Sequence, residues 1–124
     1  MDQERDKLLI LEPDPLVTRA VELAAAKLDL QPVSATDGWD AIQMLEKGEY
    51  IAVVVDCNVP RHSGDGLLRY IWEEFGEESL DRVLVLVPDE ETAARLGTGK
   101  LHTIRRSEPI ESLASAIRGC EPRH

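Results

Sequence analysis

Three short runs of consecutive apolar residues constrain the fold of this chain more than any other feature of its sequence. They are LLIL at 8–11, IAVVV at 51–55 and VLVLV at 83–87. Continuous apolar runs of this length are typical of strands that are buried on both faces, as in a parallel sheet covered by helices. Two weaker runs, QPVSA at 31–35 and LHTI at 101–104, suit strands nearer the edges of the same sheet.

Segments with helical spacing separate these runs. Asp14 and Pro15 together form a helix start, because aspartate is a good cap and proline is suited to the first helical position. Apolar residues then recur at helical spacing to residue 28, and DGWDAIQMLEKG at 37–48 ends at a glycine, a common helix stop. Further helices are expected over 67–75, 89–96 and 110–117. Five strands alternating with five helices predict an α/β fold with helices on both faces of a parallel sheet.

The size and charge of the chain limit what it can be. A length of 124 residues suits one domain, and we expect it to span 1–124 with a core at about residues 7–119. The net charge of −10 argues against sequence-independent binding of nucleic acid. No run is long enough to span a bilayer and the charged N-terminus lacks the apolar core of a signal peptide, so we expect a cytoplasmic protein without a membrane partner. Cys57 and Cys120 lack metal-ligand spacing and are expected to be free thiols.

Charged residues follow several of the predicted strands. Glu12 and Asp14 come after the first apolar run, Asp56 ends the third strand, and Arg105 and Arg106 follow the fifth. In open α/β sheets, functional residues gather beyond the carboxyl ends of the strands, where the strand order reverses. In a flavodoxin-like order that point lies between strands one and three. We therefore expect these acids and one of the arginines to converge on one rim of the sheet.

The chain resembles the receiver domain of bacterial response regulators over almost its whole length. The resemblance is carried by LLILEPDPLV at 8–17, DGWDAIQML at 37–45 and above all VVVDCNVPRHSGDGLLRYI at 53–71. In that family an Asp ends strand three, with Asn two, Pro four and Gly eight residues later, and Asp56, Asn58, Pro60 and Gly64 match these positions. The resemblance implies a flavodoxin-like three-layer sandwich with five helices and a five-stranded parallel sheet in the order 2-1-3-4-5.

The resemblance also implies a function. Receiver domains accept a phosphoryl group from a histidine kinase or phosphotransfer protein, and their aspartate is the nucleophile. It implies that Asp56 is the phosphoacceptor and that Glu12, Asp56 and Asn58 lie on the side of a magnesium ion, with Asp14 as a further candidate. Magnesium and a lysine commonly neutralise the charge on the phosphoryl oxygens. Here Arg106 is the candidate for the phosphate contact that the family's lysine makes.

Three departures from the family pattern weaken this implied site. Pro13, which has no side-chain oxygen, stands where the family has its direct metal ligand. Val87 and Pro88 stand where the family has a hydroxyl-bearing residue and a small residue. The lysine is replaced by Arg106, or by Arg105 if the alignment slips by one residue, and arginine is not equivalent to lysine. We therefore expect magnesium binding and phosphorylation to be weak or absent.

Two functions remain open, and a third is disfavoured. The first is a receiver domain in two-component phosphorelay signal transduction. The alternative is a phosphorylation-independent module, a pseudo-receiver, that uses the same fold for protein interaction or dimerisation, so that a homodimer is one expected form. A small enzyme, such as a phosphatase or a flavin-dependent protein, is disfavoured because EPDPL stands where a glycine-rich phosphate loop would follow strand one. We expect the chain not to be an enzyme.

Overall fold

Five parallel strands form one sheet in the order β2-β1-β3-β4-β5, which confirms the predicted α/β fold and strand order. The structure is a computed structural model that describes residues 5–57, 73–74, 76, 81–96 and 102–120. The bounds of the strands lie within about one residue of the predicted runs: β1 Lys7–Leu11, β2 Gln31–Ser34, β3 Ala52–Asp56, β4 Val83–Val87 and β5 His102–Arg105.

Four helices lie within the described residues: α1 Pro15–Lys27, α2 Gly38–Lys47, α4 Glu90–Leu96 and α5 Ile110–Cys120. Helix α1 starts as expected, since the Asp14 side chain caps it by accepting from the Leu16 N–H at 2.9 Å. Asp37 caps α2 in the same way, with the Asp40 N–H at 2.8 Å. The helix expected over 67–75 lies outside the described residues apart from positions 73 and 74, which are helical.

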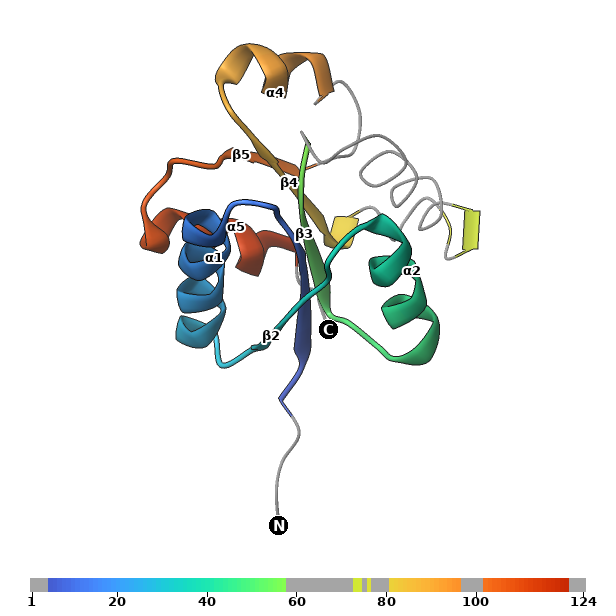
Figure 1. The fold of residues 1–124 in the computed structure, drawn as a ribbon. Coiled ribbons are helices and arrows are strands. Elements are labelled where there is room, and N and C mark those ends of the chain that lie inside the picture. The colour runs from blue at the N-terminus through green and yellow to red at the C-terminus, as the bar shows by residue number, and fades with distance from the viewer. Residues whose placement is uncertain (1–4, 58–72, 75, 77–80, 97–101, 121–124) are drawn as a thin grey trace.

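Alternate residues of each central strand enter two different cores, one on each face of the sheet. Leu8 and Ile10 of β1 pack in the core that α1 and α5 cover, together with β4 residues such as Leu84. Leu9 and Leu11 point the other way, into the core that α2 covers. Figure 1 shows α1 and α5 on one side of the sheet and α2 on the other. Burial on both faces explains why β1, β3 and β4 are continuously apolar.

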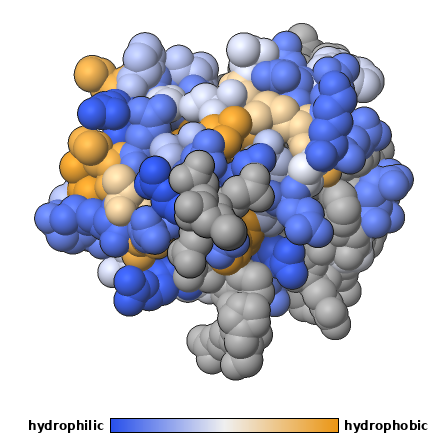
Figure 2. All heavy atoms as spheres, turned by 90° about the horizontal axis from the view of Figure 1, so that it is seen from below, coloured by the Kyte–Doolittle hydropathy of each residue, from blue (hydrophilic) through white to orange (hydrophobic). Residues whose placement is uncertain are grey.

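The outer strands and the two ends of the sheet differ from this centre. Strands β2 and β5 are exposed at their first and last residues and half-buried between them, which accounts for their weaker apolar patterns. Figure 2 views the molecule from the amino-terminal ends of the strands, where described residues are mostly hydrophilic. No helix within the described ranges is long and apolar enough to cross a bilayer. The buried charges lie at the opposite, carboxyl-terminal edge.

Candidate functional site

Three acids and one arginine meet at the carboxyl ends of the strands, and we call Glu12, Asp14, Asp56 and Arg106 the rim cluster. Arg106 Nη2 lies 2.8 Å from Glu12 Oε2 and 3.9 Å from Asp14 Oδ2. Its other terminal nitrogen, Nη1, lies 3.9 Å from Asp56 Oδ1. One guanidinium group therefore faces all three carboxylates, through two different nitrogens.

The sheet positions these side chains. Glu12 directly follows β1, Asp56 is the last residue of β3, and Arg106 directly follows β5. The main-chain N–H of Arg106 donates to Val87 O at 2.9 Å, which holds the turn after β5 against the end of β4. Strands β1 and β5 are three positions apart in the sheet, a span of about 14 Å. Two long side chains are needed to close that span, and Arg106 and Glu12 supply them.

Glu12 is the most firmly held acid of the cluster. Its side chain is fully buried, and Oε2 accepts hydrogen bonds from the Asp14 N–H and from Arg106 Nη2, both at 2.8 Å. Oε1 is buried and accepts no hydrogen bond from the residues that the structure describes. The pKa of Glu12 is raised, and burial is the main cause; the negative charge of Asp56 raises it further. The hydrogen bond from the Asp14 N–H and the positive charge of Arg106 act in the opposite direction and lower it. The negatively charged form of Glu12 is thus stabilised by the two groups that donate hydrogen bonds to it, the Asp14 N–H and the Arg106 guanidinium group.

Asp56 ends a strand that is buried along its whole length, and the residue itself is only 1 % exposed. It is paired with Leu86 in the β3–β4 register, and the next N–H, of Cys57, donates to Leu86 O at 3.0 Å. A buried carboxylate is costly unless charge or hydrogen bonds compensate it, and the Arg106 guanidinium at 3.9 Å is a nearby positive charge. A carboxylate held in this way can act as a nucleophile only towards a group that can reach it.

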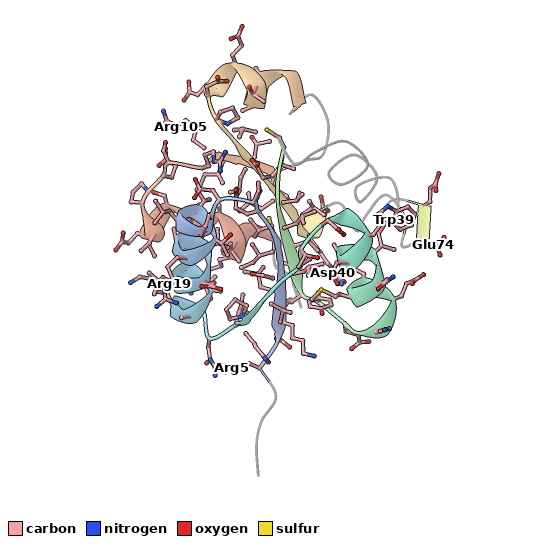
Figure 3. All side chains as sticks on the ribbon, viewed as in Figure 1. Arg5, Arg19, Trp39, Asp40, Glu74 and Arg105 are labelled. Atoms are coloured by element: carbon pink, nitrogen blue, oxygen red, sulfur yellow. The ribbon has the colours of Figure 1, made fainter. Side chains whose placement is uncertain are left out.

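The other predicted site residues lie elsewhere or outside the described part. Asn58, Pro60 and Gly64 fall outside the described residues. Asp14 is in the cluster, but its Oδ1 serves as the cap of α1. Arg105 turns away from the acids and binds Glu108, and Figure 3 shows it at the outside of the molecule. Of the two neighbouring arginines, Arg106 is thus the one that faces Asp56.

The described residues do not fit a magnesium site. Magnesium requires several oxygen ligands at about 2.1 Å in octahedral geometry. Glu12 Oε2 already accepts two hydrogen bonds, the exposed Pro13 has no side-chain oxygen, and the Arg106 guanidinium lies among the carboxylates. Among the described His, Cys, Asp and Glu residues, no group of three or more is arranged to hold a metal ion.

One contact of the site was not anticipated from the sequence. The sequence predicts a phosphate contact for Arg106, whereas its shortest contact is with Glu12, 94 residues away. No local pattern signals a pair at that separation. The sequence indicates only that the strand ends converge. That convergence limits the partners of Arg106 to Glu12, Asp14 and Asp56, but it does not indicate which of the three lies nearest.

Comparison with known proteins identifies the fold. No protein-family model matches the sequence, and no curated protein does. A sensor protein from Polaromonas sp. JS666 matches with a TM-score of 0.78 and 21 % identity, over 94 % of this chain and 96 % of that one. The chemotaxis response regulator CheY4 of Vibrio cholerae matches with a TM-score of 0.77 and 15 % identity, over 94 % and 98 %.

The chain has the fold of a response regulator receiver domain. A third structure supports this: the response regulator TrrA of Thermotoga maritima, solved in complex with Mg²⁺–BeF, matches with a TM-score of 0.76 and 15 % identity, over 93 % of this chain and 98 % of that one. At these identities the likeness establishes the receiver fold.

Proposed function

We propose that this chain is a receiver domain in two-component phosphorelay signalling, one whose Asp56 accepts a phosphoryl group weakly or not at all. The observation that carries the proposal is the position of Asp56: it ends β3 at the carboxyl edge of a receiver-type sheet, beside Glu12 and Arg106. Functional groups of such sheets gather at this edge. The proposed unit is a single non-enzymatic domain over 1–124, with its core at about residues 7–119.

The proposed chemistry is transfer of a phosphoryl group to a carboxylate. An Asp56 oxygen would attack phosphorus, its O–P bond would form, and the bond to the donor's nitrogen or oxygen would break, so that the donor keeps the bonding electrons. Magnesium supplies charge neutralisation in such transfers. Here we propose that magnesium binds weakly or not at all, and that Arg106, whose Nη1 lies 3.9 Å from Asp56 Oδ1, supplies positive charge beside the acceptor.

Two features support slow transfer. Asp56 is 1 % exposed, so a donor has little access to it. Val87 and Pro88, at the end of β4, have no hydroxyl with which to hold a phosphoryl oxygen, and Val87 is fully buried. Both features are expected to slow acceptance without removing the nucleophile.

The proposed partners follow from the proposed function. A histidine kinase or a phosphotransfer protein would donate the phosphoryl group in the cytoplasm. A homodimer is a further proposed assembly. We propose no nucleic-acid contact by this domain, because its net charge of −10 would be repelled by phosphates.

Intact-mass measurement after incubation with acetyl phosphate and magnesium tests the proposal. We expect partial addition of one phosphoryl group over a long incubation, or none, and no addition to an Asp56→Asn variant. Rapid and stoichiometric addition to Asp56 would contradict the weak acceptance proposed here. Addition that persists in the Asp56→Asn variant would show that another residue is the acceptor.

The contacts of Arg106 favour a second candidate function, a phosphorylation-independent interaction module. An arginine that already faces all three acids can hold the rim together without any phosphate. In that case Asp56→Asn would leave partner binding unchanged, whereas the first proposal expects signalling to be lost. Capture of the partner and signalling output, both compared between the wild type and the variant, separate the two: binding and signalling that are both kept favour the interaction module, and signalling that is lost while binding is kept favours the receiver.

A further inference from the structure

Arg106 occupies the centre of the rim cluster. Its Nη2 reaches Glu12 at 2.8 Å and Asp14 at 3.9 Å, and its Nη1 reaches Asp56 at 3.9 Å. The Arg106 side chain is 24 % exposed, whereas the side chains of Glu12 and Asp56 are 0 % and 1 % exposed. The positive charge therefore lies between the two buried acids and the solvent.

A cation is needed at this place for an electrostatic reason. Like charges held together away from water repel each other, and each buried carboxylate also loses its hydration. A positive group that faces both Glu12 and Asp56 offsets part of this cost. The guanidinium group does so with two separate nitrogens in one rigid plane, a geometry that a single ammonium cannot reproduce.

The same place would have to hold a magnesium ion if one were bound by these acids. Magnesium would need oxygens of Glu12 and Asp56 at about 2.1 Å from a common point. The guanidinium group, already in contact with Glu12 and facing Asp56, adds positive charge there and takes up the room. Ion and guanidinium group therefore compete for one position.

We propose that Arg106 is the resident cation of the rim cluster, in place of a divalent metal ion. The folded chain is then stabilised by its own side chain and gains nothing from magnesium. Removing Arg106 takes from the three carboxylates the guanidinium group that faces all of them, so the variant becomes less stable and acquires a response to magnesium. The inference deepens the proposed function and rests on the same cluster, but it does not require that Asp56 be phosphorylated.

Thermal unfolding of three proteins, with and without millimolar magnesium chloride at constant ionic strength, tests this inference. The proteins are the wild type, Arg106→Ala and Arg105→Ala, which removes the same charge one residue earlier. We expect Arg106→Ala to lower Tm by on the order of 10 °C and to regain several degrees with magnesium. The wild type and Arg105→Ala should not respond to magnesium. A wild type that gains as much as Arg106→Ala overturns the inference, and so does a folded Arg106→Ala that gains nothing.

A second measurement does not depend on the folding of that variant. Manganese titration of the wild type, followed by the electron paramagnetic resonance signal of the free ion, should show no stoichiometric binding. Stoichiometric binding that Asp56→Asn abolishes would overturn the inference. Neither measurement involves a phosphoryl donor. A metal-binding wild type would contradict the weak magnesium binding proposed above but would leave Asp56 as the proposed phosphoacceptor. An absence of phosphorylation would leave the proposal about Arg106 unaffected.

Discussion

Two neighbouring arginines, identical in chemistry, have opposite surroundings in this molecule. Arg105 contacts Glu108, three residues away, with Nη2 at 2.6 Å from Oε2, and its side chain is 48 % exposed. Arg106 contacts Glu12, 94 residues away, at 2.8 Å, with that acid fully buried. The shorter contact is the local one on the surface, and the longer one lies at the end of the sheet.

The contrast teaches that distance is a poor measure of what an ion pair contributes. Exposed pairs contribute about 0–1 kcal/mol, since water and salt screen both charges. A pair with a buried member behaves differently, because deleting one partner leaves the other charge without compensation in a place that water does not reach. The first three predictions below test this difference between the surroundings of Arg105 and Arg106, and the fourth tests burial of a titratable group elsewhere; they run from the largest expected effect to the smallest.

Replacing each arginine by alanine should give the largest difference between them in the free energy of unfolding. Arg106→Ala is expected to lower the free energy of unfolding by about 3 kcal/mol, because Glu12 and Asp56 remain buried after their contacts with the Arg106 guanidinium group are lost. Arg105→Ala, its matched control, is expected to lower it by less than about 1 kcal/mol. Urea unfolding at neutral pH measures both. Equal losses in the two variants would show that burial does not distinguish these pairs.

Replacing Arg106 by lysine keeps the charge and removes the planar fork. We expect a loss of about 1–2 kcal/mol in the free energy of unfolding, between wild type and Arg106→Ala, because one ammonium cannot face Glu12 and Asp56 at once. Arg105→Lys should be close to neutral. The same urea experiment measures these variants, and a fully stable Arg106→Lys would mean that charge alone matters at this position.

Replacing the acid should cost less than replacing the arginine. In Glu12→Gln the side-chain carbonyl can still accept from Asp14 and Arg106, and burial no longer opposes a charge, so we expect a change of about 1 kcal/mol or less. Arg106 also keeps Asp56 as a partner. Glu108→Gln is the surface control. A loss in Glu12→Gln as large as that in Arg106→Ala would contradict this asymmetry.

The smallest expected effect is at Cys120, a buried titratable group for which no positive charge contributes to the pKa shift. It is buried at the end of α5, and burial, with a smaller contribution from the charge of Asp81, raises the pKa of its thiol from 9.0 to about 12. The unfolded thiol ionises first, so stability falls as pH rises from about 9 towards 12. The loss at pH 9 is about 0.4 kcal/mol. Urea unfolding at pH 7 and 9 should show it in the wild type, and a Cys120→Ala variant should lack that increment.

Much of the fold could be predicted because its strands and helices produce local patterns of apolar and capping residues in the sequence. The uniformly apolar strands β1, β3 and β4 follow from burial on both faces, and the start of α1 follows from Asp14 and Pro15. The edge strand β5 begins and ends one residue later than the predicted run at 101–104, because its pattern of exposed ends and half-buried middle gives a weaker signal. The candidate site was predictable only as a set of charged residues at strand ends.

The amino-acid sequence alone determined the strands, the cap of α1 and the presence of an acid at the end of β3, because each of these depends on neighbours within a few positions. Tertiary structure decided which arginine meets which acid. Arg105 and Arg106 are one residue apart and chemically alike, and the path of the turn after β5, held by the hydrogen bond from Arg106 to Val87, directs one towards Glu12 and leaves the other at the surface. Which arginine meets Glu12 depends on how four strand ends pack together, and these strand ends come from segments far apart in the sequence.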